Sequence, residues 1–562
     1  MARRIRWQIL IASVSGLLVL GLMSFLALTN TAVSRPLNGG TYVEGFTTLP
    51  RQINPLVSDP ARDPTAADIR ALVFEGLMRI GVDGLPEPEL AAEAPQISAD
   101  GTVYTFTLRP DVQWQDGTPL TADDVVWTLR AVQSSAYAGD PVARGVWGEV
   151  LIDKLDDHTV RCTLTAPFAP FLSQATFPIL PAHLLQDVPP DQWATAPFNQ
   201  HPIGTGPYKL TELTTEHALF AANATYHDGR PFLDNVEFRF FSTTQDAQMA
   251  LMRGQIMGLG FLGTSELNRV PLPRDVTKHV TPLDAYTVLT FNMRGGPLAD
   301  VGVRRALVRG FNKDTLINDT LHGEVARLDT PILPGWWAAA PDLAVQPPSQ
   351  QAAADALTSL GYELGPDGVR TKDGQPLNLP LITDDTPDRV AAAREIARQW
   401  GALGVQVPVE TLQPDVLQQR LQAHDFTMAI HGWQRLGPDP DVLELWDSRF
   451  AASGRNYAGV QDEELDRLLR QARQEQNIAA RRQLYITFQQ RWLDLAPSIT
   501  LYQPVFVYAT RELGGLELSQ SGEATQLMSN QLLLGREDRF RNVSRWFLRS
   551  AREIRGDLRS AP

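Results

Sequence analysis

The side chains of this chain that could do chemistry do not fall into a spacing typical of an enzyme. There is no HExxH, GxSxG or GxxxxGK[ST] motif, and the nine histidines show no metal-ligand spacing. Carboxylates are plentiful, yet spacing alone assigns no pair of them as acid and base. We therefore expect no catalytic residues, no cofactor and no metal, and the sequence predicts a protein that is not an enzyme.

One formal cofactor motif, GxGxxG, occurs at Gly258, Gly260 and Gly263. In dinucleotide-binding proteins this motif follows a strand and opens a helix within a βαβ unit. Here it follows a run with helical character, residues 245–253. The context does not fit, so we interpret these glycines as structural.

One segment combines an aromatic side chain with groups that could orient a ligand: HGWQRLGPDP, residues 431–440. Trp433 offers a flat apolar wall, and Arg435, beyond Gln434, could pair bidentately with a ligand carboxylate. The alternative is that Trp433 packs in a core and Arg435 is a surface charge. Asp439 stands before a proline, which is typical of a structural turn.

The 562 residues of the chain exceed what one hydrophobic core usually supports, so we expect two or three lobes. Hydrophobic residues make up 43% of the chain, as in ordinary globular proteins. The formal net charge of −14 argues against nucleic acid or an anionic lipid surface as a partner. Cys162 is the single cysteine and lies in a strand-like run, which predicts a buried free thiol.

The N-terminus carries a candidate membrane segment. Three arginines among the first six residues precede an uncharged run from Trp7 to Leu28, and about 20 residues suffice to cross a bilayer as a helix. The arginines favour a cytoplasmic N-terminus with everything after Asn30 exported. The run is longer than a usual secretory h-region and the cleavage site near residues 32–34 is poor, so we favour an uncleaved anchor over a cleaved signal.

The elements that must position these groups are clearest over residues 104–130. Apolar and polar residues alternate over 104–108, which is typical of a half-buried strand. Asp116-Gly117 marks a turn, and Thr121 and Asp124 have the spacing of a capping box. A strand, a turn and a capped helix are therefore predicted in that order.

Other elements follow from apolar periodicity and from glycine and proline stop signals. We predict helices over residues 351–360, 389–403, 464–473 and 479–495, and strands near 40–46, 405–409, 499–501 and 505–507.

The string YTFTLRPDVQWQDGTPLTADDVVWTLR, residues 104–130, resembles the signature of the family 5 solute-binding proteins, the extracytoplasmic receptors of peptide, nickel and oligosaccharide ABC importers. Further similar strings occur in the family's order: GGTY at 39–42, INPL at 53–56, LVFEGL at 72–77 with PELA at 88–91, HPIGTGPYK at 201–209, FN at 291–292 with VRRAL at 303–307, GW at 432–433 with PDP at 438–440, and VSRW at 543–546.

This resemblance implies an α/β, two-lobed periplasmic-binding-protein-like fold of the class II type, with an additional small inserted domain and, in this chain, a preceding N-terminal transmembrane helix. The chain crosses between the lobes twice. The implied layout is a membrane anchor or signal at 1–30, a linker at 31–38, a first lobe from 39–68 with 204–283 and 500–547, an inserted small domain at 69–203, a second lobe at 284–499, and a flexible basic tail at 548–562.

Binding sites of this family lie between the lobes, which close over the ligand by hinge motion. Trp433, Gln434, Arg435 and Asp439 are our candidate ligand contacts in such a cleft, although Asp439 is more typical of a structural turn. Four weaker candidates are equally consistent with packing: Glu44 and Phe46 at the end of the first strand, Asn292 at the end of a crossing strand, and Trp336 on a loop.

One departure from the family concerns the ligand's ammonium group. Many peptide-binding relatives have an aspartate three residues after the tryptophan, where it pairs with the ligand's α-ammonium group, and this chain has Leu436 there. A buried ammonium group without a carboxylate costs several kcal/mol. The usual dipeptide mode is therefore open to question, with Asp439 or Asp441 as candidate substitutes.

The leading hypothesis is a membrane-tethered, monomeric solute-binding protein at the extracytoplasmic face of the bacterial cell membrane, in the periplasm or at the cell surface. It captures a small hydrophilic ligand, with a peptide favoured, and delivers it to the permease of an ABC transporter. The alternatives are a non-peptide ligand (an oligosaccharide, an opine or a metal chelate), a tethered sensor without a transporter, or a secreted form after signal cleavage. An extracytoplasmic hydrolase is disfavoured by the missing motifs.

Overall fold

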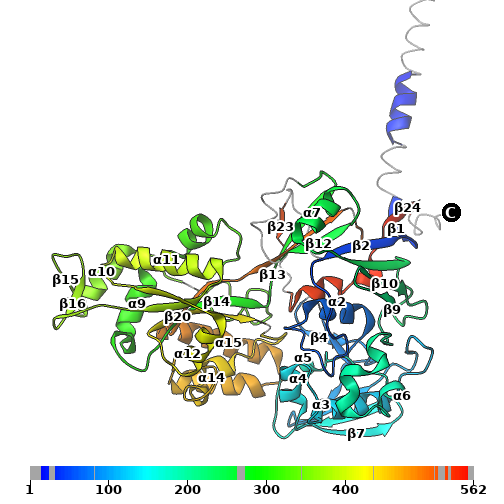
Figure 1. The fold of residues 1–562 in the computed structure, drawn as a ribbon, viewed down its shortest axis with the longest axis horizontal. Coiled ribbons are helices and arrows are strands. Elements are labelled where there is room, and N and C mark those ends of the chain that lie inside the picture. Colours follow the sequence, from blue (N-terminus) through cyan, green and yellow to red (C-terminus); the bar gives the residue numbers. More distant parts are fainter. Residues whose placement is uncertain are drawn as a thin grey trace, which may run out of the picture.

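The structure is a computed structural model that describes residues 14–23, 32–81, 83–261, 272–343, 345–434, 436–511, 513–516, 526–528 and 533–554. Its body has three parts, each built on a sheet (Figure 1). The second lobe lies at the left of the view, the first lobe at the upper right and the inserted domain at the lower right.

The first lobe is built on an eight-stranded sheet of order β23-β13-β22-β12-β2-β11-β10-β9. Its strands come from distant parts of the chain: β2 (Thr41–Phe46), β9 (Tyr208–Leu213), β10 (His217–Ala222), β11 (Asn235–Phe240), β12 (Gly258–Phe261), β13 (Val276–Pro282), β22 (Val505–Arg511) and β23 (Gln526–Met528). Helices α2 (Pro64–Val73) and α7 (Thr244–Met252) and the 3-10 helices η6 (Arg536–Phe540) and η7 (Val543–Arg545) belong to this lobe. A Cβ on Gly258 would overlap the Tyr42 hydroxyl, which explains this glycine of the GxGxxG string by packing.

The second lobe is built on a five-stranded sheet of order β19-β18-β20-β14-β21. Strand β20 pairs in parallel with β18 and antiparallel with β14, so the ends of β18 and β20 and the start of β14 share one edge. Its strands are β14 (Ala285–Phe291), β18 (Leu381–Asp384), β19 (Val409–Leu412), β20 (Met428–Gln434) and β21 (Ser498–Tyr502). Its helices are α9 (Val301–Arg309), α10 (Gln350–Ser359), α11 (Pro387–Gly401), α12 (Pro414–Gln422), α13 (Leu443–Trp446), α14 (Glu463–Gln474) and α15 (Ile478–Leu495), with a π-helical turn at Thr315–Thr320. A small three-stranded sheet is formed by β15 (Glu363–Leu364), β16 (Arg370–Lys372) and β17 (Gln375–Pro376).

The inserted domain carries a four-stranded sheet of order β5-β6-β8-β7. Its elements are β3 (Met78–Ile80), β4 (Pro86–Pro88), β5 (Gln96–Ile97), β6 (Val103–Thr107), α3 (Ala122–Gln133), α4 (Pro141–Trp147), β7 (Leu151–Asp156), β8 (Thr159–Thr163), α5 (Phe171–Gln174) and α6 (Ala182–Leu185). Its core is continuous with that of the first lobe, since Tyr104 and Trp147 belong to the same buried cluster as Tyr42 and Phe238. The second lobe has separate buried clusters.

Two strand crossings join the first and second lobes. One runs from β13 to β14 through Leu283 and Asp284, and the other runs from β21 to β22 through Gln503 and Pro504. The N–H of Leu283 donates to the carbonyl of Pro504 (3.0 Å), and the side-chain amide of Gln503 donates to the carbonyl of Leu283 (2.8 Å). The crossings therefore lie side by side, in the arrangement of a hinge.

Most local sequence predictions are confirmed. Strand β6 and helix α3 follow each other as predicted, and the Thr121 N–H donates to Asp124 Oδ2 (2.9 Å) in a capping box. The strand predicted near 405–409 differs, because β19 begins only at Val409. Pro408 has no N–H for a strand ladder, which accounts for the late start.

The two ends of the body pair with each other. Strand β1 (Ala32–Leu37) runs antiparallel to β24 (Arg549–Ile554) in a separate two-stranded sheet. The sequence predicts a linker at 31–38 and a flexible tail at 548–562, whereas the structure pairs residues of both as strands; residues 555–562 lie outside the described residues.

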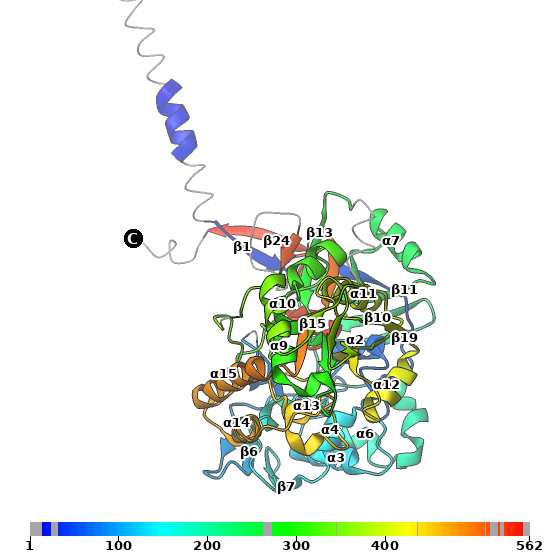
Figure 2. The ribbon, with the colours of Figure 1, turned by 90° about the vertical axis from the view of Figure 1, so that its left-hand side faces the viewer.

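Residues 14–23 form a helix that stands clear of the body in both views (Figure 2). The predicted membrane segment runs from Trp7 to Leu28, and its other residues, 7–13 and 24–28, lie outside the described residues. In the described part of the chain, no helix combines the length and the apolar character that crossing a membrane requires.

Candidate ligand-binding site

The predicted binding segment begins in β20, the central strand of the second lobe's sheet. Trp433 lies opposite Tyr286 of β14 in the strand register. Ligands of open α/β sheets bind at the carboxyl ends of the parallel strands. The edge at which β18 and β20 end is therefore the favoured ligand side, and both strand crossings leave the lobe at this edge.

Trp433 is packed on several sides. Its ring stacks on Tyr457 with a centroid distance of 5.4 Å and an interplanar angle of 15°, and His431 meets it edge-on at 5.1 Å. The guanidinium of Arg455 lies 4.9 Å from the ring centroid. Only 8% of Trp433 is exposed, so the indole contributes mainly to the lobe's core in this conformation.

The loop after β20 reaches the boundary with the inserted domain. Gln434 is exposed at the end of the strand, and Arg435 lies outside the described residues. The N–H of Gly437 donates to Asp284 Oδ2 (2.8 Å), which ties this loop to a strand crossing. A Cβ on Gly437 would lie 3.9 Å from Nε2 of Gln174, in the inserted domain.

Asp439 is one half of a buried ion pair. Its two carboxylate oxygens accept from Arg481 at 2.5 and 2.6 Å, and both side chains are almost fully buried. Burial alone lowers the pKa of Arg481, but the Asp439 carboxylate outweighs it and raises that pKa overall, so the guanidinium stays charged; burial raises the pKa of Asp439 despite the Arg481 charge. Asp441 is also paired, with Arg473 Nε at 2.7 Å. Each candidate substitute for the missing ammonium partner is thus engaged by an arginine.

Glu44 and Phe46 lie in the first lobe's interior. Glu44 accepts hydrogen bonds from Arg539 (2.7 Å) and from the Tyr508 hydroxyl (2.6 Å), and only 1% of it is exposed. Arg539 also pairs with Asp68 at 2.5 Å. Phe46 packs on Phe238 with a centroid distance of 4.3 Å. Both residues therefore have structural partners here, and the ligand role assigned to them stays a prediction.

Asn292 and Trp336 also make structural contacts. The Asn292 amide donates to the carbonyls of His424 (3.1 Å) and Phe426 (2.8 Å), which fixes the turn before β20. Trp336 is 4% exposed and belongs to the same buried cluster as Trp433.

Sequence reasoning missed a charged group at the favoured edge. Asp384 ends β18 and pairs with Arg389. A Cβ added to Gly432 would overlap the Arg389 guanidinium, so this guanidinium lies against β20. His431 Nε2 lies 2.9 Å from the hydroxyl of Thr290, and burial, together with the Arg389 charge, lowers the pKa of His431 to about 3. The two aspartates that directly follow the apolar strand at 381–383 were the signal that could have revealed this group.

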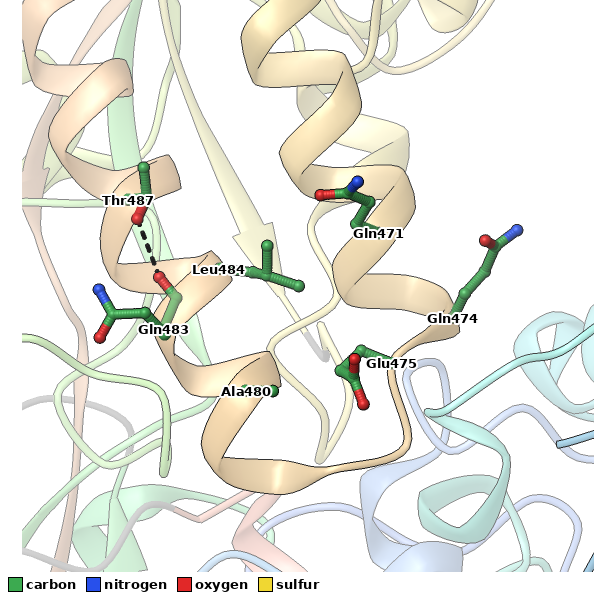
Figure 3. A pocket seen from close by; sticks show the side chains of 7 residues that line it. All are labelled: Gln471, Gln474, Glu475, Ala480, Gln483, Leu484 and Thr487. Atoms are coloured by element: carbon green, nitrogen blue, oxygen red, sulfur yellow. Dashed lines mark hydrogen bonds between the residues drawn. The ribbon is translucent and has the colours of Figure 1, made fainter. Parts of the chain in front are cut away.

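A separate hollow of ≈ 610 Å³ lies between α14 and α15 (Figure 3). It is lined by Gln471, Gln474, Glu475, Ala480, Gln483, Leu484 and Thr487. None of the predicted site residues lines it. Its lining contains no aromatic side chain, whereas small-molecule sites usually have apolar and aromatic walls.

Two α/β lobes joined by paired strand crossings define a two-lobed binding protein. Among the described residues, no cluster of three or more His, Cys, Asp or Glu side chains could hold a metal ion. The model of the bacterial extracellular solute-binding proteins, family 5, matches residues 86–452, and the chain belongs to this family.

Named relatives cover most of the chain. The oligopeptide-binding protein AppA of Bacillus subtilis is 26% identical, over 84% of this chain and 88% of the relative. The dipeptide-binding protein of Escherichia coli is 25% identical, over 77% of this chain and 84% of the relative. The solved structure of NikZ from Campylobacter jejuni in complex with Ni(L-His) is 25% identical, with a TM-score of 0.67, and covers 90% of this chain and 99% of that one.

Proposed function

We propose that this protein captures a small hydrophilic ligand between its lobes, with a peptide as the favoured class, and delivers it to the permease of an ABC importer. The observation that carries this proposal is family membership in a chain whose two lobes are joined by paired crossings. Peptide as the ligand class is supported by relatives named as oligopeptide-binding and dipeptide-binding proteins. Closure over the ligand is the step that presents a loaded form to the permease.

A non-peptide ligand is the second candidate. Leu436 stands where many relatives have the ammonium-pairing aspartate, and the arginine pairs of Asp439 and Asp441 leave neither of them as a free substitute. A ligand without an ammonium group at this place avoids the cost of a buried unpaired cation. A metal chelate is one such class, and a relative has been solved with Ni(L-His).

We also propose that the N-terminal segment tethers a monomeric body to the extracytoplasmic face of the membrane. The described helix at residues 14–23 exposes its apolar side chains, among them Leu17 with 71% exposed. Exposed apolar surface of this kind favours burial in a bilayer. We further propose the domain boundaries that the resemblance implies: a first lobe from 39–68, 204–283 and 500–547, an inserted domain at 69–203 and a second lobe at 284–499.

The test is a ligand screen on the purified full-length protein in detergent. Native mass spectrometry identifies any co-purified ligand, and tryptophan fluorescence follows titration with a tripeptide pool, a nonapeptide, nickel–histidine and cello-oligosaccharides. Saturable binding of peptides alone supports the first candidate, and saturable binding of the chelate or sugar alone supports the second. A protein that carries no ligand and responds to none of the four probes contradicts both.

A matched pair of variants locates the site. Gln434→Trp places a bulky ring at the favoured edge, where Gln434 is exposed, and should weaken ligand binding at least tenfold. Gln351→Trp makes the same change at an exposed position on α10 of the same lobe and should leave binding unchanged. Equal affinities of the two variants would place the ligand elsewhere.

A further inference from the structure

The turn between α14 and α15 touches the inserted domain. The N–H of Ala169 donates to the carbonyl of Arg473 (2.8 Å). The Tyr104 hydroxyl lies 3.4 Å from Gln476 Oε1 and the same distance from the carbonyl of Phe168. Gln476 also fills the space beside Gly101, where an added Cβ would come within 2.9 Å of its amide nitrogen. The second lobe therefore has a defined contact with the other half of the molecule, beside the hollow of Figure 3.

Arg473 belongs both to this contact and to the loop after β20. Its Nε donates to Asp441 Oδ2 (2.7 Å), and its guanidinium lies 5.6 Å from the ring centroid of Phe168 in the inserted domain. The neighbouring pair, Asp439 with Arg481, anchors the same loop to the first turn of α15. A shift of the loop must therefore move Arg473 or break its bond to Asp441.

The contact lies across the boundary that a hinge motion opens. The inserted domain shares its buried cluster with the first lobe, so these two parts move together, whereas the second lobe has its own core. The contact is made of hydrogen bonds and of the Arg473 guanidinium against the Phe168 ring, and Gln476 is an exposed residue. Such a contact can form and break without unfolding either lobe.

We propose that the α14–α15 turn is a closure latch, in which Gln476 and Arg473 hold the second lobe against the inserted domain and Arg473 is the positioning residue that links the latch to the ligand loop. The proposal rests on lobe closure, as in the proposed function. Because Arg473 contacts both the loop after β20 and the inserted domain, a ligand that holds the loop in its present position also favours the latched state.

The test measures the ratio of closed to open molecules by single-molecule FRET on the full chain. Fluorophores are attached at Glu93→Cys in the inserted domain and Gln351→Cys on α10, both exposed positions. Native Cys162 is fully buried and does not compete for the label. The ratio is measured without added ligand and then with tryptic peptides of casein as the probe.

The latch variants should shift this ratio toward the open state. Losing one hydrogen bond lowers a population ratio about threefold to tenfold, so we expect a loss in that range for Gln476→Ala and for Tyr104→Phe, which keeps the buried ring. The double variant should lose no more than either single variant, because the two side chains form one interaction. Gln474→Ala changes the exposed last residue of α14, which lines the hollow; it is the matched control and should match the wild type.

Variants of Arg473 test whether this residue positions the latch or only stabilises the second lobe. Arg473→Gln should lower the closed fraction and weaken the response to the casein peptides, two readouts that a loss of second-lobe stability alone does not change. Arg473→Lys should restore part of both, because it keeps the charge beside Asp441 and loses the planar group over Phe168.

Two results would overturn the latch: a single FRET state in the wild type, or variants with the wild-type ratio. If the variants shift the ratio as expected while casein peptides leave it unchanged, the latch stands and peptide capture fails. If peptides close the wild type and every variant equally, peptide capture stands and the latch fails.

Discussion

Asp439→Asn tests whether the loop after β20 is held by a buried ion pair. The change leaves Arg481 charged and buried without its bidentate partner, and breaking such a pair typically costs about 3–5 kcal/mol. Arg481 keeps its bond to the carbonyl of Ala472 (2.7 Å) and its place 5.3 Å from the Trp337 ring centroid. These remaining contacts place the expected loss near the lower end, about 3 kcal/mol of unfolding free energy.

The measurement is hydrogen exchange of second-lobe peptides in urea, because a chain with several lobes does not unfold in one step. Glu464→Gln is the control: it removes one partner of an exposed pair with Arg467 in the same lobe and should leave the hydrogen exchange of that lobe close to the wild type. Replacing both buried partners, Asp439→Leu with Arg481→Met, should cost much less than Asp439→Asn, because no charge is left buried.

The reasoning is refuted if Asp439→Asn costs no more than the exposed control, or if the double replacement costs as much as the single one. Loss of ligand binding with unchanged stability would instead make Asp439 a ligand-contacting group.

Three further predictions concern buried groups. The folded pKa of His431 is lowered to about 3, so the stability that this residue contributes is complete above its unfolded pKa of about 6.5 and is lost as pH falls. At pH 5 the second lobe of the wild type should lose about 2 kcal/mol relative to pH 8 that His431→Gln does not lose, as hydrogen exchange of second-lobe peptides in urea at both pH values would show. Gly204→Ala forces a Cβ onto the Val73 carbonyl and should speed hydrogen exchange of the peptides around residues 73 and 204, whereas Gly145→Ala, in open space on α4, should not speed exchange. Burial raises the pKa of the Cys162 thiol to about 12, so a thiol reagent should label it only at the rate of unfolding, and fast labelling in native buffer would contradict its burial.

Local elements were predictable because their signals are local. The capping pair of Thr121 and Asp124 is three residues apart, and the apolar spacing of α14 and α15 fixes which face of each helix packs.

The site was less predictable because its decisive partners are distant in sequence. Glu44 ends a strand in the sequence, and only the fold shows that Arg539, 495 residues later, lies against it. Asp439 reads as a turn residue until Arg481 reaches it from α15. Spacing along the chain does not show which carboxylates fold against an arginine, and those pairings decide which carboxylates stay free for a ligand.

The sheet of the first lobe has a consequence for how the protein is made. Strand β2 is synthesised early, but its neighbour β12 pairs with β22, which is synthesised late. Glu44 of β2 likewise pairs with Arg539, near the other end of the chain. The second lobe's strands, by contrast, come from one uninterrupted stretch between residues 285 and 502. The second lobe can therefore fold during synthesis or export, before the chain is complete. The first lobe stays incomplete until almost the whole polypeptide is available. A chain truncated before residue 505 leaves Glu44 of β2 without its buried partner Arg539.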